Sequence, residues 1–216
     1  YTGTTTISAG TLRYGAGNAI AGGAVVVNDG GTYDLNNFSD TIGALTVNSG
    51  AIGGAVTRVG DDNWIMAYVH LAHDCLVGNH TIFANNTQLA GHVEVGDWVI
   101  LGGFTVVHQF VRVGAHGMTA MCALLFADQP PFVMSQGQPA QARSMNFEGL
   151  RRRGFSPERI AAVKAMHKAL YRENLTLEQA MVQIEAIAQA QPEAAPDVAM
   201  MNSFLRQTSP QRGIVR

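Results

Sequence analysis

An apolar residue returns at every sixth position along the middle of this 216-residue chain. Eleven of twelve successive hexads begin with an apolar residue, and the next residue is Gly or Ala in most of them. An amphipathic helix is the alternative, but its apolar residues would recur about every 3.6 positions, whereas the six-residue register holds without a slip. The repeat fits a parallel β-helix of triangular cross-section, with three hexads in each coil. The hexads begin at Val59, Ile65, Leu71, Val77, Phe83, Leu89, Val95, Leu101, Val107, Val113, Thr119 and Leu125.

Such a β-helix would have an apolar interior and tight corners. We expect the first side chain of each hexad to point into the prism and the small residue after it to permit the corner. Twelve hexads would make about four coils. Two prolines, Pro130 and Pro131, end the repeat and force a turn. The β-helix is therefore predicted to span residues 56–135.

Helical patterns follow the prolines. Ser156 and Pro157 fit the N-cap and the first-turn proline of one helix. Thr176 and Gln179 form a capping box at the start of a second helix, and a third helix is expected after it. The chain is thus predicted to be mainly β, with an α-helical domain at residues 136–216.

A different repeat occupies the N-terminal segment, residues 1–55. The sequences ISAG, VNDG and VNSG recur there every 20 residues, starting at Ile7, Val27 and Val47. A repeat of that length predicts one solenoid rung per unit. The stretch YTGTTTISAGTL also resembles the passenger-domain repeats of bacterial autotransporters, which implies a right-handed parallel β-helix derived from a secreted surface protein. Residues 1–55 are therefore predicted to form a separate β-solenoid segment.

Composition argues against two kinds of partner. With a formal net charge of −2 and 14% charged residues, the chain lacks the basic character of a nucleic-acid-binding protein. Its apolar runs are shorter than the roughly 18 to 20 residues that span a bilayer, so no transmembrane segment is expected, and no signal peptide opens the chain. Cys75 and Cys122 lack the spacing of a metal site, and both are expected to be reduced and buried.

Five of the seven histidines lie between His70 and His108. The hexads that begin at Leu71, Leu89 and Val107 each contain one of these histidines and are one full coil apart. They should therefore stack on one face of the β-helix, with neighbouring strands about 4.8 Å apart. His80 and His116 fall on other hexads and are not part of this group. The expected strip consists of His73, Asp74, Gly91, His92, His108 and Gln109, with His70 at the adjacent corner.

A strip of imidazoles beside one carboxylate suits general-base catalysis on a hydroxyl group, because histidine takes a proton near neutral pH and an aspartate can orient it. His73 and Asp74 are the candidate pair. Neighbours on a strand point to opposite faces, so their pairing requires a corner or a bulge. Two alternatives remain open at this point: polar residues at solvated corners, or a metal site made by His73, His92 and a symmetry mate.

Four stretches carry a resemblance to a known family. They are AYVHLAHDCLVGN at 67–79, LAGH at 89–92, VHQF at 107–110 and NFEGLRRRGF at 146–155. Residues 56–216 closely resemble the acyl-carrier-protein-dependent UDP-N-acetylglucosamine 3-O-acyltransferases of lipid A biosynthesis. The resemblance implies a left-handed β-helix, a homotrimer with active sites in clefts between subunits, and transfer of a 3-hydroxyacyl group from acyl carrier protein to the sugar 3-hydroxyl. It also implies a cytoplasmic location and no cofactor beyond the phosphopantetheine arm of the donor.

The resemblance also assigns roles to residues. His73 would be the general base, Asp74 its support, and the Gly91 N–H a donor to the oxyanion. Met121 would limit the acyl-chain length and favour a shorter chain. The nucleotide-sugar and acyl site would be lined by His70, His92, His108 and Gln109, whereas Asn146, Glu148, Arg152 and Arg153 would meet phosphate or the pantetheine arm. Arginine suits phosphate because its guanidinium binds two oxygens at once; the alternative for 151–153 is a solvated helix end.

The resemblance breaks at the N-terminal side. The family pattern includes further hexapeptide coils there, with an acidic residue and a lysine that contact substrate, but no lysine precedes Lys164 in this chain. An engineered fusion of a foreign solenoid segment to a trimeric β-helix explains this arrangement. Two hypotheses follow: an acyltransferase with severely reduced turnover, since misplacement by about 1 Å can cost on the order of a hundredfold, or a structural scaffold without activity.

Overall fold

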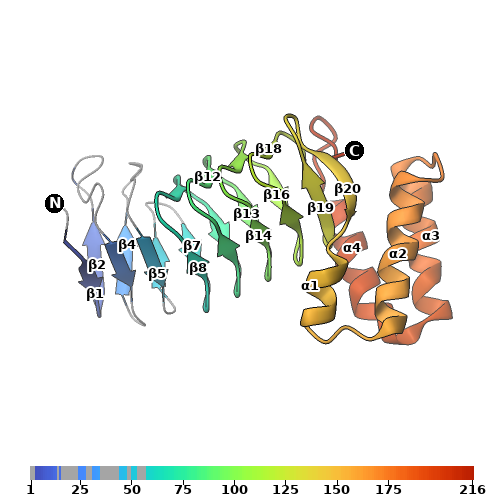
Figure 1. Ribbon diagram of the computed structural model, residues 1–216, viewed down its shortest axis with the longest axis horizontal. Coiled ribbons are helices and arrows are strands. Elements are labelled where there is room, and N and C mark those ends of the chain that lie inside the picture. Colours follow the sequence, from blue (N-terminus) through green and yellow to red (C-terminus); the bar gives the residue numbers. More distant parts are fainter. Residues whose placement is uncertain are drawn as a thin grey trace.

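Parallel strands stack along one axis from the N-terminus, and a group of helices lies at the other end of the molecule (Figure 1). The computed structural model describes residues 3–13, 15, 24–27, 31–34, 44–47, 50–52 and 57–216. The described strands form three sheets of nine, seven and four strands, which we call the first, second and third sheet.

Each of the twelve predicted hexads contributes one two-residue strand, β7 to β18. Each strand from β7 to β15 pairs in parallel with the strand three hexads further on, as Val77 does with Val95, so three strands complete one coil and the predicted four coils are present. Four strands lie in the second sheet, β7 (Arg58–Val59), β10 (Leu76–Val77), β13 (Glu94–Val95) and β16 (Arg112–Val113). Four lie in the first sheet, β8 (Trp64–Ile65), β11 (Ile82–Phe83), β14 (Ile100–Leu101) and β17 (Met118–Thr119). The third sheet holds β9 (His70–Leu71), β12 (Gln88–Leu89), β15 (Val106–Val107) and β18 (Leu124–Leu125).

The second residue of each of these strands points into the prism and is buried. Phe83, Leu89 and Leu101 have no exposed surface, so each contributes on the order of 2 kcal/mol through burial of apolar surface. Thr119 is the one polar residue in this position and is also fully buried. Its hydroxyl lies 2.8 Å from that of Thr105. This hydrogen bond offsets the cost of burying a hydroxyl group in the apolar interior.

The small residue of each hexad has a different role from the one predicted. The left-handed backbone conformation of each corner falls two positions later, at Asp74 (φ 59°), His92 (φ 60°) and Phe110 (φ 63°). A Cβ atom on Gly60 would collide with the Asn79 side chain of the next coil. The corner therefore does not require the small residue; close contact between successive coils does.

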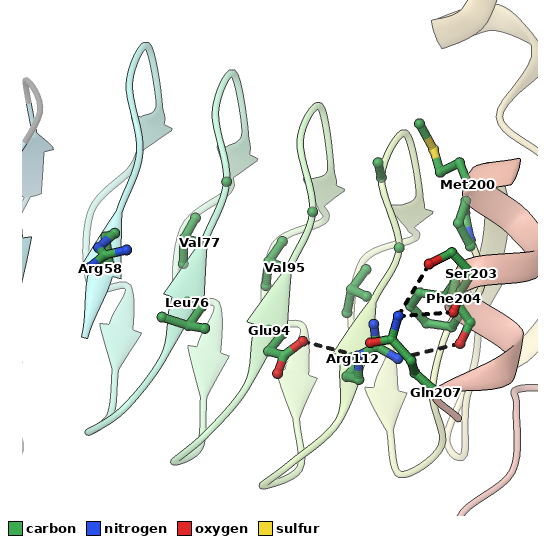
Figure 2. Close-up of a pocket in the computed structure, with 16 residues that line it drawn as sticks. Arg58, Leu76, Val77, Glu94, Val95, Arg112, Met200, Ser203, Phe204 and Gln207 are labelled. Atoms are coloured by element: carbon green, nitrogen blue, oxygen red, sulfur yellow. Dashed lines mark hydrogen bonds and ion pairs between the residues drawn. The ribbon is translucent and has the colours of Figure 1, made fainter. Parts of the chain in front are cut away.

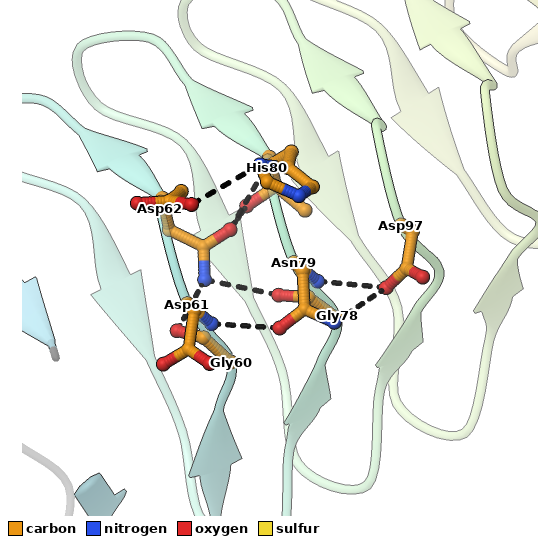
Figure 3. Close-up of polar contacts among 9 residues, drawn as sticks. Gly60, Asp61, Asp62, Gly78, Asn79, His80 and Asp97 are labelled. Carbon is orange, nitrogen blue, oxygen red and sulfur yellow. Dashed lines mark hydrogen bonds and ion pairs between the residues drawn. The ribbon is translucent and has the colours of Figure 1, made fainter. Parts of the chain in front are cut away.

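Polar side chains connect the coils at one corner, as Figure 3 shows. The backbone N–H of Asp61 donates to Asn79 Oδ1 at 2.7 Å, and the backbone N–H of Asn79 donates to Asp97 Oδ1 at 2.7 Å. Each carboxylate or amide oxygen thus satisfies a backbone donor of the preceding coil that no strand partner reaches.

The N-terminal strands also stack in parallel. Val25 pairs with Thr5 on one side and with Leu45 on the other, so each partner is one repeat unit away in the sequence. One rung per repeat unit, as predicted, is therefore present in this pairing. The strands are β1 (Thr5–Ile7), β3 (Ala24–Val27) and β5 (Ala44–Val47) in the first sheet and β2 (Gly10–Arg13), β4 (Gly31–Asp34) and β6 (Gly50–Ile52) in the second.

The two solenoid segments meet at an antiparallel seam. Strand β6 pairs with β7 in antiparallel fashion, with Ala51 opposite Arg58, and β5 pairs likewise with β8, with Leu45 opposite Ile65. Before the seam the chain passes from the first sheet to the second, and after it from the second to the first. Because the axis continues in one direction (Figure 1), the winding sense of the chain reverses at the seam.

After the prolines, two antiparallel strands that the sequence did not predict precede the helices. They are β19 (Val133–Gln136) and β20 (Gln141–Met145), and they extend the first sheet. The helices are α1 (Phe147–Arg152), α2 (Pro157–Tyr171), α3 (Leu177–Ala190), the short 3-10 helix η1 (Pro192–Ala194) and α4 (Ala195–Arg206). Ser156 caps α2, and Thr176 with Gln179 forms the predicted capping box of α3. No helix among the described residues is long and apolar enough to cross a membrane.

The two cysteines differ in environment. Both are free, as predicted. Cys75 is buried, its thiol donates to the Ala90 carbonyl at 3.2 Å, and burial raises its pKa to about 11. The prediction that Cys122 is buried is wrong. It occupies a corner position with φ 57°, where the side chain points away from the prism.

Candidate functional site

The predicted His73–Asp74 pair forms at the corner where the third sheet turns into the second. We call residues 72–75, 90–93 and 108–111 the histidine corner. His73 Nδ1 lies 2.7 Å from Asp74 Oδ2. The left-handed backbone at Asp74 provides the corner that this pairing requires. Because an ionised carboxylate can only accept, Nδ1 carries the proton and Nε2 is left as the basic nitrogen.

Gly91 lies against the basic nitrogen of His73. A Cβ atom at position 91 would be 2.6 Å from His73 Nε2 and 2.7 Å from Cε1. Within residues 57–216 the Gly91 backbone N–H donates to no protein acceptor. The absence of a side chain at Gly91 therefore leaves the imidazole nitrogen unobstructed, and the nearby backbone N–H is a free donor within these residues.

His92 stands one coil above Asp74. Its Nε2 atom lies 3.7 Å from Asp74 Oδ2, its ring meets that of His73 edge-on at 5.0 Å, and it stacks on Phe110 at 4.6 Å. His73, Asp74 and His92 offer three ligand atoms within 4.8 Å of one another. A single chain thus supplies a possible metal donor set without a symmetry mate, although a cation would compete with His73 for the same Asp74 oxygen.

Of the other predicted residues, Gln109 lies in the same column as His73 and Gly91, whereas His108, His70 and Met121 lie outside this column. His108 follows Ala90 in the register of the coils; its Nδ1 is 3.2 Å from the Gln109 carbonyl, and its ring is 5.6 Å from that of Phe126. His70 is in β9, in register with Gln88 of β12. Met121 lies near the corner between the first and third sheets, and its side chain is 70% exposed.

The second group of predicted residues is at a different place in the chain. Asn146, Glu148, Arg152 and Arg153 line a pocket of about 800 Å³ between α1 and the first sheet. Asn146 is buried and caps α1: its Oδ1 accepts from the Gly149 N–H at 3.1 Å, and its Nδ2 donates to a carbonyl at 3.1 Å. Its polar atoms are therefore engaged in holding α1.

The charged residues of α1 divide into two sets. Glu148 pairs with Arg152 at 3.1 Å and with Arg151 at 3.5 Å, and all three are well exposed. Arg153 instead donates to the Trp98 carbonyl at 2.9 Å and lies 3.3 Å from His116 Nδ1, with its guanidinium carbon 5.3 Å from the centre of the Trp98 ring. Only Arg153 is held by the β-helix itself.

Sequence reasoning missed His116 and Trp98. They occupy equivalent corner positions on successive coils, where the second sheet turns into the first, and His80 precedes them in the same column. Burial lowers the pKa of His116 to about 4, with the Arg153 charge acting in the same direction, so this imidazole is neutral at physiological pH. The sequence signal that could have identified them is the aromatic ring that recurs once per coil, at His80, Trp98 and His116.

The two groups of residues occupy different corners of one prism. The histidine corner lies between the third and second sheets, whereas Trp98 and His116 lie between the second and first. One chain therefore presents two separate groups of candidate residues, with an imidazole at one corner and arginines at the other.

A further pocket of about 460 Å³ lies between the second sheet and α4 (Figure 2). Arg112 spans it, donating to Glu94 at 3.0 Å and to the Phe204 carbonyl at 3.4 Å. The pocket contains none of the residues predicted from the sequence to act on substrate.

Comparison with known proteins identifies a family and several relatives of this chain. Residues 128–215 match the family described as Udp N-acetylglucosamine O-acyltransferase, domain 2, and residues 57–90 match the bacterial transferase hexapeptide family. The acyl-(acyl-carrier-protein)–UDP-N-acetylglucosamine O-acyltransferase of Albidiferax ferrireducens is 75% identical over 172 residues, covering 79% of this chain and 65% of that protein. The protein of the same name from Thiobacillus denitrificans is 57% identical over 163 residues, covering 74% and 60%. The chain thus spans 60 to 65% of the length of these curated relatives.

Solved structures agree in fold along nearly the whole chain. LpxA from Acinetobacter baumannii superposes with a TM-score of 0.73 at 30% identity, over 99% of this chain and 95% of that one. The UDP-N-acetylglucosamine acyltransferase of Francisella novicida gives a TM-score of 0.73 at 31% identity, over 89% and 75%.

The fold and the matched repeats define a hexapeptide-repeat transferase. Within that class, the chain belongs to the UDP-N-acetylglucosamine O-acyltransferase family. The predictions of family and of a left-handed β-helix with C-terminal helices are confirmed.

Proposed function

We propose that this chain is an acyltransferase that moves a 3-hydroxyacyl group from acyl carrier protein to the 3-hydroxyl of UDP-N-acetylglucosamine. The observation that carries the proposal is the His73–Asp74 pair with its basic Nε2 against Gly91. The names of the similar proteins from Albidiferax and Thiobacillus supply the donor and the acceptor.

The geometry supports a two-step acyl transfer. His73 Nε2 takes the proton of the sugar 3-hydroxyl while that oxygen attacks the thioester carbon, and Asp74 stabilises the imidazolium that forms. The Gly91 N–H donates to the tetrahedral oxyanion. The intermediate then collapses to the ester, and the departing pantetheine thiolate takes the proton from His73.

We further propose that the complete site forms between subunits of a homotrimer. The histidine corner of one chain and the pocket beside α1 lie at different corners of the prism, so they can meet on one substrate only if different chains contribute them. A closed cyclic assembly allows each chain to use both half-sites at once. In that arrangement His70, His92, His108 and Gln109 line the cleft, and Glu148, Arg152 and Arg153 approach from the neighbouring chain.

Met121 would set the length of the acyl chain in that cleft. Its side chain is 70% exposed in a single chain, so it can limit an acyl group only when a neighbouring subunit covers it. Replacement by glycine removes the side chain and should shift the preferred donor toward longer acyl chains.

A mixing experiment tests the proposal. The His73→Ala and Arg153→Ala variants are each assayed for acyl transfer from 3-hydroxyacyl carrier protein to UDP-N-acetylglucosamine, and then co-expressed with different tags and purified as mixed trimers. If the site lies between chains, about one site in four in a random mixture is intact and activity returns. No recovery from mixed trimers, with an active wild-type protein, would contradict a shared site.

We also propose that residues 1–55 are a segment of separate origin, joined to a β-helix at 56–135 and a helical domain at 136–216. The longer rung of the N-terminal repeat, compared with the three-hexad coil, and the reversal of winding at the seam support this division. Reduced turnover remains a prediction, as does the scaffold alternative. A well-folded wild-type trimer that transfers no acyl group would favour the scaffold.

A further inference from the structure

The neutral imidazole of His116 contacts Arg153, which lines the pocket beside α1, and it has none of the roles assigned so far. Its ring stacks on Phe132 at 5.6 Å and meets Phe155 edge-on at 5.1 Å, and only 8% of its surface is exposed. The backbone fixes it as well: its N–H donates to the Asp97 carbonyl at 2.8 Å. A ring held on so many sides has a single orientation.

That orientation presents Nδ1 to the Arg153 guanidinium at 3.3 Å. Arg153 can only donate, so Nδ1 must be the unprotonated nitrogen. The low pKa of His116, caused by burial, keeps it in this accepting form. Together with the Trp98 carbonyl, the imidazole engages two of the five guanidinium N–H groups, and the others remain available to a ligand.

We propose that His116 is a positioning residue, which orients Arg153 to bind a phosphate oxygen of a nucleotide in the pocket of about 800 Å³. This inference rests on the proposed function for the identity of the nucleotide sugar. A free arginine side chain loses rotamer freedom when it binds an anion; the acceptors on the β-helix hold Arg153 before the ligand arrives and remove that cost from binding. Neighbouring Arg152 pairs with exposed Glu148 and lacks this preorganisation.

The test uses two substitutions at position 116. His116→Phe keeps an aromatic ring but has no acceptor, and the backbone accepts it, because Phe104 and Phe110 occupy the equivalent position at the other two corners with φ 59° and 63°. His116→Asn places an amide oxygen close to the position of Nδ1. We expect the Phe variant to raise the Kd for UDP and the KM for UDP-N-acetylglucosamine about tenfold, with kcat nearly unchanged, and the Asn variant to restore most of the affinity. His167→Phe, a ring on α2 beside Tyr171, is the matched control.

A double-mutant cycle with Arg153→Ala separates positioning from a general structural effect. If His116 acts through Arg153, the Phe substitution weakens UDP binding no further in the Arg153→Ala background. Unchanged UDP affinity in the Phe variant, equal losses in the Asn and Phe variants, or additive losses in the cycle would each overturn the inference.

Hydrogen exchange of the Arg153 guanidinium, followed by nitrogen-15 NMR without ligand, distinguishes this inference from the proposed function. Slow exchange in the wild type and the Asn variant, with fast exchange in the Phe variant, supports positioning even if the protein transfers no acyl group. Fast exchange in all three overturns positioning, whether or not transfer is observed.

Discussion

At the scale of single residues, the histidine corner depends on the absence of one side chain. Gly91 does not have a positive φ, so the backbone would accept alanine there. The methyl group would nevertheless lie 2.6 Å from His73 Nε2, and the imidazole would have to move. The glycine is therefore required by the site and not by the coil.

We expect Gly91→Ala to lower kcat about a hundredfold, because displacement of a catalytic group by about 1 Å has an effect of this size. The free energy of unfolding should change by less than about 1 kcal/mol, since His73 can rotate toward solvent. Gly103→Ala is the matched control, as its Cβ would come no closer than 3.4 Å to any atom. Equal activity in the two variants would show that Gly91 does not position His73.

Asp128, at the end of the β-helix, has a buried carboxyl group with one oxygen that no hydrogen bond from the described residues satisfies. It is fully buried, its Oδ1 accepts from the Arg112 backbone N–H at 3.1 Å and lies 3.7 Å from Arg212, and its Oδ2 has no partner in the described part of the chain. Burial raises the pKa of this carboxyl group, although both arginines oppose the change.

The pH dependence of stability follows from that direction. A pKa raised by folding means that the contribution of the group is complete below the unfolded-state pKa and is lost as pH rises through the higher folded-state value. As pH falls from neutral toward 5, the Tm of the wild type should therefore rise relative to the Tm of Asp128→Asn. Thermal unfolding of both proteins across this range measures the difference; a constant or opposite trend would show that Asp128 is not destabilised by its charge.

At the scale of elements, an ion pair joins helices α2 and α4 of the C-terminal core. Arg159 of α2 donates to both carboxylate oxygens of Asp197 of α4 at 2.8 Å, and its guanidinium lies 3.8 Å above the Phe155 ring. Asp197 is buried, and Arg159 is its ion-pair partner.

Asp197→Asn should destabilise the protein by about 2 kcal/mol, since it leaves Arg159 without a counter-charge in a partly buried position. Arg206→Gln is the control, because the Arg206–Glu185 pair is 4.0 Å apart and more than half exposed on both sides; its effect should stay within about 0.5 kcal/mol. Urea unfolding of the two variants provides the comparison. A loss in the control as large as that in Asp197→Asn would mean that burial is unimportant here.

The elements that the sequence predicted are those whose pattern is local. The hexad register predicted every strand from β7 to β18, and capping residues predicted α2 and α3. Strands β19 and β20 were missed because they are stabilised by pairing with each other and with β17. The left-handed conformation of Trp98 and Phe110 was also missed, since aromatic residues rarely adopt it; both rings stack on a ring one coil away, Trp98 on His80 and Phe110 on His92.

The same distinction applies to the candidate site. The pairing of His73 with Asp74 could be predicted because both lie in one hexad. His116 could not, since its partner Arg153 lies far along the chain, on a helix whose position depends on tertiary packing. The role of Asn146 as a buried cap of α1 was likewise not predicted, because its motif resembles a substrate-binding loop.

At the scale of the whole molecule, the proposed site between subunits predicts a trimer in solution. We expect light scattering after gel filtration to give a solution mass near three times the 23.0 kDa of one chain. Dilution that yields monomers should abolish acyl transfer together with the trimer. A monomer of full activity would contradict both the assembly and the shared site.

The reversal of winding at the seam also has a mechanical consequence. When a coil is pulled along its axis, it tends to rotate in a direction set by its hand. The two solenoid segments have opposite hands, so a pull induces opposite rotations in them. A force between the N-terminal strands and the helical domain would therefore turn the seam between β6 and β7 relative to both ends, because the rotations of the two segments oppose each other.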